Sequence, residues 1–428
     1  MVGQDVAIKA GRLFDGSGQP PLRDVVVLIE DSKIVRVGTQ GEVEIPSSAQ
    51  IVDASDKFVM PGLIDTHTHI SKTSSPTSST GWGVAEHPLV GWAVRSTAHV
   101  KWILESGVTT IRDMGSLGYI DIALRNAISD RIIVGPRIVA SGKGLTCTGG
   151  HTDMLKHIKW FAHRVGPYPR ALEEEIGSGT VVDGVSEILK AVRQQVKLGA
   201  DYVKFWATGG VMEAEERAGA QEFSDEEIRA IVGEAKRARK PIAVHALTAE
   251  AIKTCIRAGV DTIEHGIFAD EECVNMMKEE GIYLVPTLVA YRKLTRTDVG
   301  FPAAAVEVAK RAVAAHGKTL RMAKRASVKI AMGTDSGSPY GNMHGVCQAE
   351  ELELMVSEGL TETETLTAAT KTAAEAVKLE DKIGTIEEGK LADLIVLNGN
   401  PLKDIRIFQD KNRIELVMKD GKILVRRN

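Results

Sequence analysis

Short apolar segments alternate with longer amphipathic ones from residue 60 to about residue 380, and this alternation constrains the fold more than any other feature. Helical periodicity is clear in 224–240, where Ser224 and Glu227 form a capping box, and again in 248–259. Eight strands that alternate with helices predict a closed parallel (β/α)8 barrel of the TIM type. An open doubly wound sheet is the alternative, but no GxGxxG loop follows the first strand. The expected strands are GLIDTHT, VTTIRDMG, RIVASG, YVKFWA, IAVHA, TIEHG, YLVPTL and KIAMGTDSG.

The two ends of the chain have a different pattern. Residues 5–58 and 385–428 contain short alternating or β-branched runs separated by turn residues. The sequence KDGK at 419–422 has Asp-Gly at its centre and predicts a hairpin turn. We therefore expect 1–59 and 382–428 to form one small β-sandwich domain, with the barrel as a second domain over 60–381.

Composition and charge exclude several classes of protein. Lys and Arg total 53 against 57 for Asp and Glu, a net charge of −4, which argues against a nucleic-acid or polybasic membrane surface. The four cysteines form no CxxC pair, so they predict neither a thiolate zinc site nor a disulfide framework. No apolar run reaches about 18 residues, and the first residues lack the apolar core of a signal peptide. We expect a cytoplasmic protein.

Potential metal ligands stand at the ends of five predicted strands. His67 and His69 end the first strand, and residues i and i+2 of a strand point to the same side, so the two imidazoles can chelate one metal ion. This spacing alone is a weak signal. Further candidates follow at the carboxyl ends of other strands, which meet at the catalytic mouth of a barrel: Lys204, His245, His265 and Asp335.

Lys204 and Asp335 each allow two interpretations. Lys204 lies between Val203 and Phe205, where a lysine is costly unless it is paired, deprotonated or able to reach solvent. A neutral lysine can also react with CO₂, and the resulting carbamate is a two-oxygen anion that can bridge two metals. Asp335 is either a helix N-cap or a metal ligand that carries a proton.

The motifs GLIDTHTHI, YVKFWATGG, PIAVHA, TIEHG and GTDSG, in this order, resemble the amidohydrolase superfamily with a binuclear metal centre. VMPGLID before the barrel and GTIEEGKLADLIVLNGNPL after it fit as well. Within the superfamily, TGGHTD at 148–153 and the ending LVMKDGK are similar to the imidazolonepropionase-like, Xaa-Pro-dipeptidase-like branch. This branch includes carboxypeptidase-type dipeptidases and ochratoxin-hydrolysing amidohydrolases.

The resemblance implies a complete ligand set for two divalent metal ions. His67, His69 and Asp335 would hold the more buried ion, and His245 and His265 the more exposed one. Carboxylated Lys204 and a hydroxide would bridge them, and Asp335 would move a proton from the attacking hydroxide to the leaving nitrogen. Zinc suits such a histidine-rich site, although manganese and cobalt are also compatible.

Three further residues are predicted to contact the substrate. His151, in the loop after the third strand, could polarise the substrate carbonyl; Tyr291 follows the seventh strand, and His344 lies on the eighth loop. His151 and Tyr291 each also have a purely structural interpretation, as a loop residue and a strand-end residue respectively. Two long loops add an aromatic wall, mixed with basic residues, that would suit a bulky amide with a free carboxylate: Trp82, Trp160, Phe161 and Tyr168, with Lys156, Lys159, Arg164 and Arg170.

The leading hypothesis is a metal-dependent amidohydrolase that releases a C-terminal amino acid from N-acyl amino acids, ochratoxin A among them, or from dipeptides. One alternative is a cyclic-amide hydrolase of the imidazolone or lactam type. Mononuclear enzymes of that kind typically lack the bridging lysine, so Lys204 favours the first hypothesis. The alternative of another class is a non-catalytic assembly module with the same fold, which would usually have lost ligands. We expect a small-molecule substrate, a homo-oligomer, and neither nucleic-acid nor membrane binding.

Overall fold

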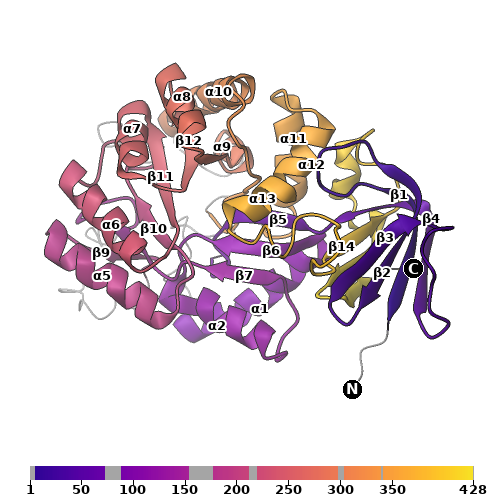
Figure 1. Ribbon diagram of the computed structural model, residues 1–428. Coiled ribbons are helices and arrows are strands. Elements are labelled where there is room, and N and C mark those ends of the chain that lie inside the picture. The colour runs from indigo at the N-terminus through magenta and orange to yellow at the C-terminus, as the bar shows by residue number, and fades with distance from the viewer. Residues whose placement is uncertain are drawn as a thin grey trace.

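Both ends of the chain contribute to one sheet in the computed structural model, which describes residues 5–72, 88–153, 177–211, 219–296, 303–338 and 341–427. The seven strands have the order β16-β15-β14-β4-β1-β2-β3. Figure 1 shows the indigo N-terminal strands beside the yellow C-terminal ones, at the right of the molecule. The strands are β1 (Val6–Leu13), β2 (Leu22–Glu30), β3 (Lys33–Thr39), β4 (Gln50–Pro61), β14 (Leu394–Leu397), β15 (Ile414–Lys419) and β16 (Lys422–Arg426).

Successive side chains of this sheet pack on opposite faces. Ile8 and Val27 belong to one apolar cluster, whereas their neighbours Ala7 and Val26 belong to another. The predicted turn is confirmed, because Asp420 and Gly421 join β15 to β16 with positive φ angles of 50° and 72°. The strands share a single hydrogen-bonded sheet, so the two-layered sandwich and the exact domain boundaries stay predictions.

The middle of the chain alternates strands and helices as predicted, and the helices α5 to α8 lie along the outside in Figure 1. The strands are β5 (Leu63–Thr68), β6 (Val108–Asp113), β7 (Arg137–Ala140), β8 (Gly144–Thr146), β9 (Gly179–Val181), β10 (Val203–Trp206), β11 (Ile242–Thr248), β12 (Thr262–Phe268) and β13 (Tyr283–Val285). The α-helices are α1 (Leu89–Glu105), α2 (Ile120–Ser129), α5 (Gly184–Leu198), α6 (Asp225–Arg237), α7 (Ala249–Ala258), α8 (Glu271–Glu279), α9 (Leu288–Leu294), α10 (Ala303–Arg325), α11 (Cys347–Ser357), α12 (Glu362–Ala368) and α13 (Lys371–Ala376). Short 3-10 helices are η2 (Leu117–Tyr119), η3 (Ile405–Gln409) and η4 (Lys411–Arg413).

The strands of this middle segment pair in parallel. One sheet has the order β5-β6-β7 and another the order β13-β12-β11-β10-β8-β9. The amide of Tyr202 donates to the carbonyl of Ala140, which links the start of β10 to β7. Parallel bridges from Leu284 to Ile330 and from Thr68 to Ser336 link β13 back to β5. These links support the predicted (β/α)8 barrel, whose closure stays a prediction.

The predicted eighth strand, 329–337, is wrong as a continuous strand, because only the bridges at Ile330 and Ser336 are formed. Asp335 has a φ of 55°, outside the β region, so the extended backbone is interrupted there. The seventh strand ends at Val285, three residues before its predicted end, because Pro286 lacks a donor and Thr287 has a φ of 55°.

Local signals at helix ends are confirmed. Ser224 caps α6, its side chain accepts from the Glu227 amide, and the Glu227 side chain bonds back to the Ser224 amide. The helices pack their apolar faces onto the parallel strands, and Ile228 and Ile231 of α6 share one large core cluster with Val203 and Val244. Within the described residues, no helix has both the length and the apolar character needed to span a membrane.

Candidate active site

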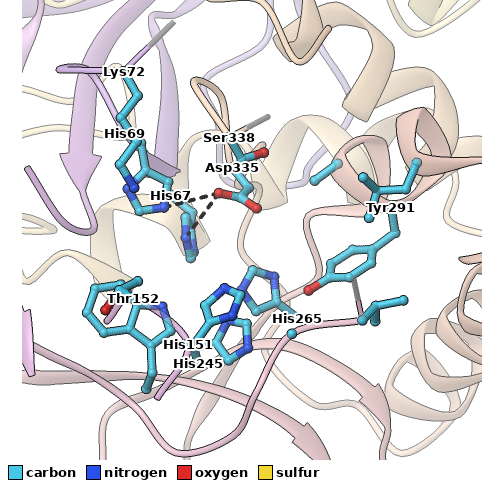
Figure 2. Close-up of a pocket in the computed structure, with 15 residues that line it drawn as sticks. His67, His69, Lys72, His151, Thr152, His245, His265, Tyr291, Asp335 and Ser338 are labelled. Atoms are coloured by element: carbon cyan, nitrogen blue, oxygen red, sulfur yellow. Dashed lines mark ion pairs between the residues drawn. The ribbon is translucent and has the colours of Figure 1, made fainter. Parts of the chain in front are cut away.

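The first histidine pair meets Asp335 at one end of the parallel strands. His67 lies near the end of β5 and His69 just after it, and both side chains are buried. The Oδ1 atom of Asp335 lies 3.7 Å from His67 Nε2 and 3.2 Å from His69 Nε2, as the dashed lines in Figure 2 mark. Ligand atoms of all three residues lie within 4.8 Å of one another, a spacing suited to one metal ion.

The second ring nitrogen, Nδ1, of His67 and of His69 has a hydrogen-bond acceptor on the side away from Asp335. His67 Nδ1 lies 2.6 Å from Glu264 Oε2, and His69 Nδ1 lies 2.9 Å from the carbonyl oxygen of Gly115. A carboxylate and a carbonyl only accept hydrogen bonds, so both Nδ1 atoms donate. The Nε2 lone pairs are therefore left facing Asp335, which is the tautomer that metal binding requires.

Glu264 is itself fixed by an ion pair. Its Oε1 atom lies 2.7 Å from Arg112 Nη2 and accepts from Thr262 Oγ1, and both charged side chains are fully buried. Arg112 Nε also donates to the carbonyl oxygen of Thr66, at 2.6 Å. The pair therefore joins β6 and β12 to β5 on the side of His67 away from Asp335.

Asp335 is positioned by its backbone. Its amide donates to the carbonyl oxygen of His67 at 2.7 Å, and its own carbonyl oxygen accepts from Asn342 Nδ2 at 2.7 Å. Asp65 accepts from both the amide and the hydroxyl of Thr334, which ties the preceding residue to β5. Burial by itself raises the pKa of Asp335, but the close contact with His69 and the nearby Lys204 outweigh it, so the pKa lies below its ordinary value.

The three remaining predicted ligands lie beside this cluster. The ring of His265 lies 5.0 Å from that of His67 and 4.5 Å from that of His245. His265 has a left-handed backbone, with a φ of 70°, and its Nδ1 atom lies 2.7 Å from Thr287 Oγ1. Two buried atoms here have no hydrogen-bond partner, Lys204 Nζ and His245 Nε2. Unpartnered buried nitrogens at one place match the ligand set expected for a metal centre.

Burial favours the uncharged forms of these groups. It lowers the pKa of His69 to about 4 and holds the pKa values of His245 and His265 well below their ordinary range, with nearby positive charges adding to the effect. Burial also lowers the pKa of Lys204 to about 8. Neutral imidazoles are the form that binds metal ions, and a neutral amine is the form that reacts with CO₂.

Tight packing surrounds Lys204 and His151. Lys204 Nζ lies 4.9 Å from the centre of the Trp206 ring. A Cβ atom on Gly144 would lie 2.3 Å from Trp206, and one on Gly210 would lie 2.3 Å from His151. Both positions therefore require glycine, for close approach rather than for a turn.

Two of the three predicted substrate residues line the cavity next to the ligand cluster. His151 stacks on His245 with ring centres 4.8 Å apart. Tyr291 packs edge-on against His265 at 5.4 Å, on α9 rather than directly at the end of a strand. Figure 2 shows its hydroxyl pointing toward the three histidines. The complete described lining is His67, His69, Lys72, His151, Thr152, Trp206, Gly210, Val211, His245, His265, Ala290, Tyr291, Leu294, Asp335 and Ser338.

His344 is placed differently from its prediction. It is buried and absent from the cavity lining. Its Nε2 atom lies 2.8 Å from the carbonyl oxygen of Lys72 and its Nδ1 atom 3.0 Å from Ser336 Oγ. These contacts hold two loops together behind the cavity wall, so the structure does not bring His344 to the substrate side.

The sequence does not single out Glu264, Arg112 or Lys72. Glu264 precedes His265 in TIEHG, on a buried strand. A carboxylate in such a strand was the signal that could have identified it. Lys72 follows His69 by three residues but lies outside every periodic segment. The aromatic and basic residues predicted for the two long loops lie outside the described residues: Trp82, Trp160, Phe161, Tyr168, Lys156, Lys159, Arg164 and Arg170.

Comparison with known proteins agrees with this site. The model of the Amidohydrolase family matches residues 58–424. This chain belongs to the amidohydrolase family. Proteins of this family generally bind metal ions, and the chain is a hydrolase of carbon–nitrogen bonds. The resemblance drawn from its sequence motifs is therefore confirmed.

Three relatives show where the chain lies within the family. It is 34% identical over 427 residues to the ochratoxinase of Aspergillus niger, covering 97% of this chain and 86% of that protein. It is 26% identical to the imidazolonepropionase of Kosmotoga olearia, covering 93% of this chain and 90% of that protein. It also resembles a Xaa-Pro dipeptidase whose crystal structure has methionine bound in the active site. The two sequences are 35% identical, and the structures superimpose with a TM-score of 0.86 over 99% of this chain and 100% of that one.

Proposed function

We propose that this amidohydrolase cleaves the amide bond of N-acyl amino acids or dipeptides and releases an amino acid with a free carboxylate. One observation carries the proposal. Three potential ligand residues, His67, His69 and Asp335, offer atoms within 4.8 Å of one another, and the unpartnered buried nitrogens Lys204 Nζ and His245 Nε2 lie in the same cluster. A non-catalytic assembly module has no need for such a costly group of buried polar atoms.

The ligand chemistry fits a binuclear centre in a closed barrel. His67, His69 and Asp335 would hold one divalent ion, and His245 and His265 the other, with zinc the metal that best suits this histidine-rich set. Such ions supply an activated water and polarise the scissile carbonyl. The amine of Lys204 would add to CO₂, forming an N–C bond and releasing one proton, and the resulting carbamate would serve as a further anionic ligand.

The chain's own side chains would then handle the proton and the substrate. Asp335 has a lowered pKa and is ready to accept a proton at one carboxylate oxygen and return it to the leaving nitrogen. His151 and Tyr291 line the cavity next to His245 and His265, where they would contact the substrate carbonyl. Trp206, Val211 and Leu294 would accommodate an apolar acyl group.

The relatives favour an amino acid as the leaving group. The Xaa-Pro dipeptidase holds methionine, a free amino acid, in its active site, and another relative is named ochratoxinase. Ochratoxin A, an N-acyl-phenylalanine, is therefore one candidate substrate. We also keep the prediction that the chain forms a homo-oligomer.

A hydrolysis screen tests this function. Purified protein should release phenylalanine from N-acetyl-phenylalanine, lose this activity after chelation, and regain it with added zinc. A cyclic amide of the imidazolone type is the comparison substrate. Hydrolysis of the cyclic amide with no release of amino acids would move the function to the cyclic-amide alternative.

A further inference from the structure

Lys72 is a buried cation in the wall of the candidate active site. It follows β5 and lines the cavity, with only 4% of its surface exposed. Among the described lining residues, it is the one lysine or arginine. Lys72 therefore supplies the one ammonium group of the described cavity lining.

The backbone that carries Lys72 is held firmly. The Lys72 amide donates to the carbonyl oxygen of His69 at 2.9 Å. His344 Nε2 lies 2.8 Å from the Lys72 carbonyl oxygen, and His99 Nδ1 lies 2.8 Å from that of Ile70. The rings of His99 and His344 lie 4.6 Å apart. Two neighbouring histidines thus fix this short turn, so the backbone position from which the lysine side chain starts is well defined.

The charge of Lys72 is suited to binding an anion. The lysine side chain ends in an ammonium group, which offers three hydrogen-bond donors and no acceptor. A cation in a partly desolvated wall forms a stronger hydrogen bond to a carboxylate than one in open water.

The position of Lys72 relative to Asp335 indicates which part of a substrate it meets. Asp335 would return a proton to the leaving nitrogen, and the carboxylate of a leaving amino acid is separated from that nitrogen by one carbon atom. The carboxylate must therefore lie close to Asp335. Figure 2 shows Lys72 on the same side of the cavity as His69 and Asp335, across from His151 and His245. Ser338 also lines the cavity and is drawn beside Asp335.

We propose that Lys72 binds the free α-carboxylate of the leaving amino acid and is the residue that selects acids over esters and amides. This inference rests on the proposed hydrolysis of N-acyl amino acids. It adds an orientation, in which the carboxylate lies at Lys72 and the acyl group lies toward Trp206, Val211 and Leu294.

Lys72→Met tests this assignment, because methionine keeps an unbranched side chain of similar length and suits a buried position. Lys143→Met is the matched control, since Lys143 is also buried but does not line the cavity. The assay measures kcat/KM for N-acetyl-phenylalanine and for its methyl ester in metal-loaded protein, together with metal content. Calorimetric binding of L-phenylalanine is the second readout.

The wild-type protein and Lys143→Met should prefer the acid by about tenfold to a hundredfold, the worth of a hydrogen bond to a charged group. Lys72→Met should hydrolyse the ester at the wild-type rate, lose the preference for the acid, and bind L-phenylalanine correspondingly more weakly. Lys72→Arg keeps the positive charge and should retain part of the preference for the acid. If Lys72→Met loses metal, the comparison is made with Lys72→Arg instead.

The possible failures are distinguishable. If Lys72→Met keeps the acid preference, Lys72 is not the carboxylate group, although the proposed function stands. Equal rates for acid and ester in the wild-type protein would overturn the assignment as well. If the wild-type protein hydrolyses neither compound, the proposed function fails. Binding of L-phenylalanine then decides alone: loss in Lys72→Met supports a carboxylate subsite, and unchanged binding overturns it.

Discussion

Replacing Glu264 with glutamine should weaken both metal binding and folding. The carboxylate of Glu264 accepts from His67 on one oxygen and from Arg112 and Thr262 on the other, and all these side chains are buried. Glutamine keeps the size but has one oxygen and one amide group. Its oxygen is needed by the Arg112 guanidinium, which can only donate, so the amide group faces His67 Nδ1.

This reversal changes the tautomer of His67. The Nδ1 atom would have to accept a hydrogen bond, which moves the ring proton to Nε2, the atom that faces Asp335. A supporting carboxylate behind a metal-binding histidine is worth about tenfold to a hundredfold in metal affinity, so Glu264→Gln should lose about that much. Arg112 also loses its counter-charge in a fully buried position, which should cost about 3–5 kcal/mol of the free energy of unfolding.

The assay combines urea unfolding of metal-free protein with competition for zinc against a chelator of known affinity. Glu351→Gln is the control, because Glu351 is equally buried but accepts from the backbone amides of Leu288 and Val289 and contacts no predicted ligand. Its zinc affinity should stay within about threefold of the wild type. Wild-type zinc affinity in Glu264→Gln would refute the tautomer argument, even if the protein were less stable.

Four further predictions follow from the site. Lys204→Ala should lose most metal and activity and recover part of both with added short carboxylic acids; a variant with normal metal content and rate rules out the carbamate. Asp335→Asn should reduce kcat by about a hundredfold to ten-thousandfold while the fold survives, and a rate within tenfold of wild type removes it from the proton transfer. Gly210→Ala places a Cβ atom 2.3 Å from His151 and should lower kcat/KM by about tenfold to a hundredfold, with metal content unchanged; an unaffected rate means that the position of His151 is unimportant. The folded protein protonates His69 only near pH 4, whereas the unfolded chain does so near 6.5. As the pH falls from 6.5 to 4, the unfolded state therefore binds the additional proton, and metal-free protein should lose about 1.4 kcal/mol of unfolding free energy per pH unit. A urea midpoint that stays constant over this range contradicts the assignment.

Periodicity was sufficient to predict most of the described elements of the middle segment. Alternation of apolar strands and amphipathic helices is a property of consecutive residues, and so are the capping box at Ser224 and the hairpin at Asp420 and Gly421. The segment around Asp335 was harder, because its left-handed backbone is imposed by distant partners. Asp65, for example, is 269 residues away from Thr334, to which it bonds.

The closeness of the predicted ligand residues was predictable for the same reason, since carboxyl ends of parallel strands meet at one edge. The supporting residues were not. Glu264 lies 197 positions from His67, and no local pattern reveals that the two side chains meet. His344 shows the converse, because a histidine on the correct loop turned away from the cavity to bond Ser336 and the Lys72 backbone. Side-chain direction within loops depends on tertiary contacts that the sequence does not display.

The proposed function requires a binuclear metal centre, and elemental analysis of purified protein never exposed to a chelator tests this requirement most directly. We expect about two divalent ions per chain, because six potential ligand residues lie together: His67, His69, Asp335, Lys204, His245 and His265. Lys204→Ala measured in parallel should fall well below that value. One ion or none per wild-type chain at full occupancy would contradict the binuclear centre.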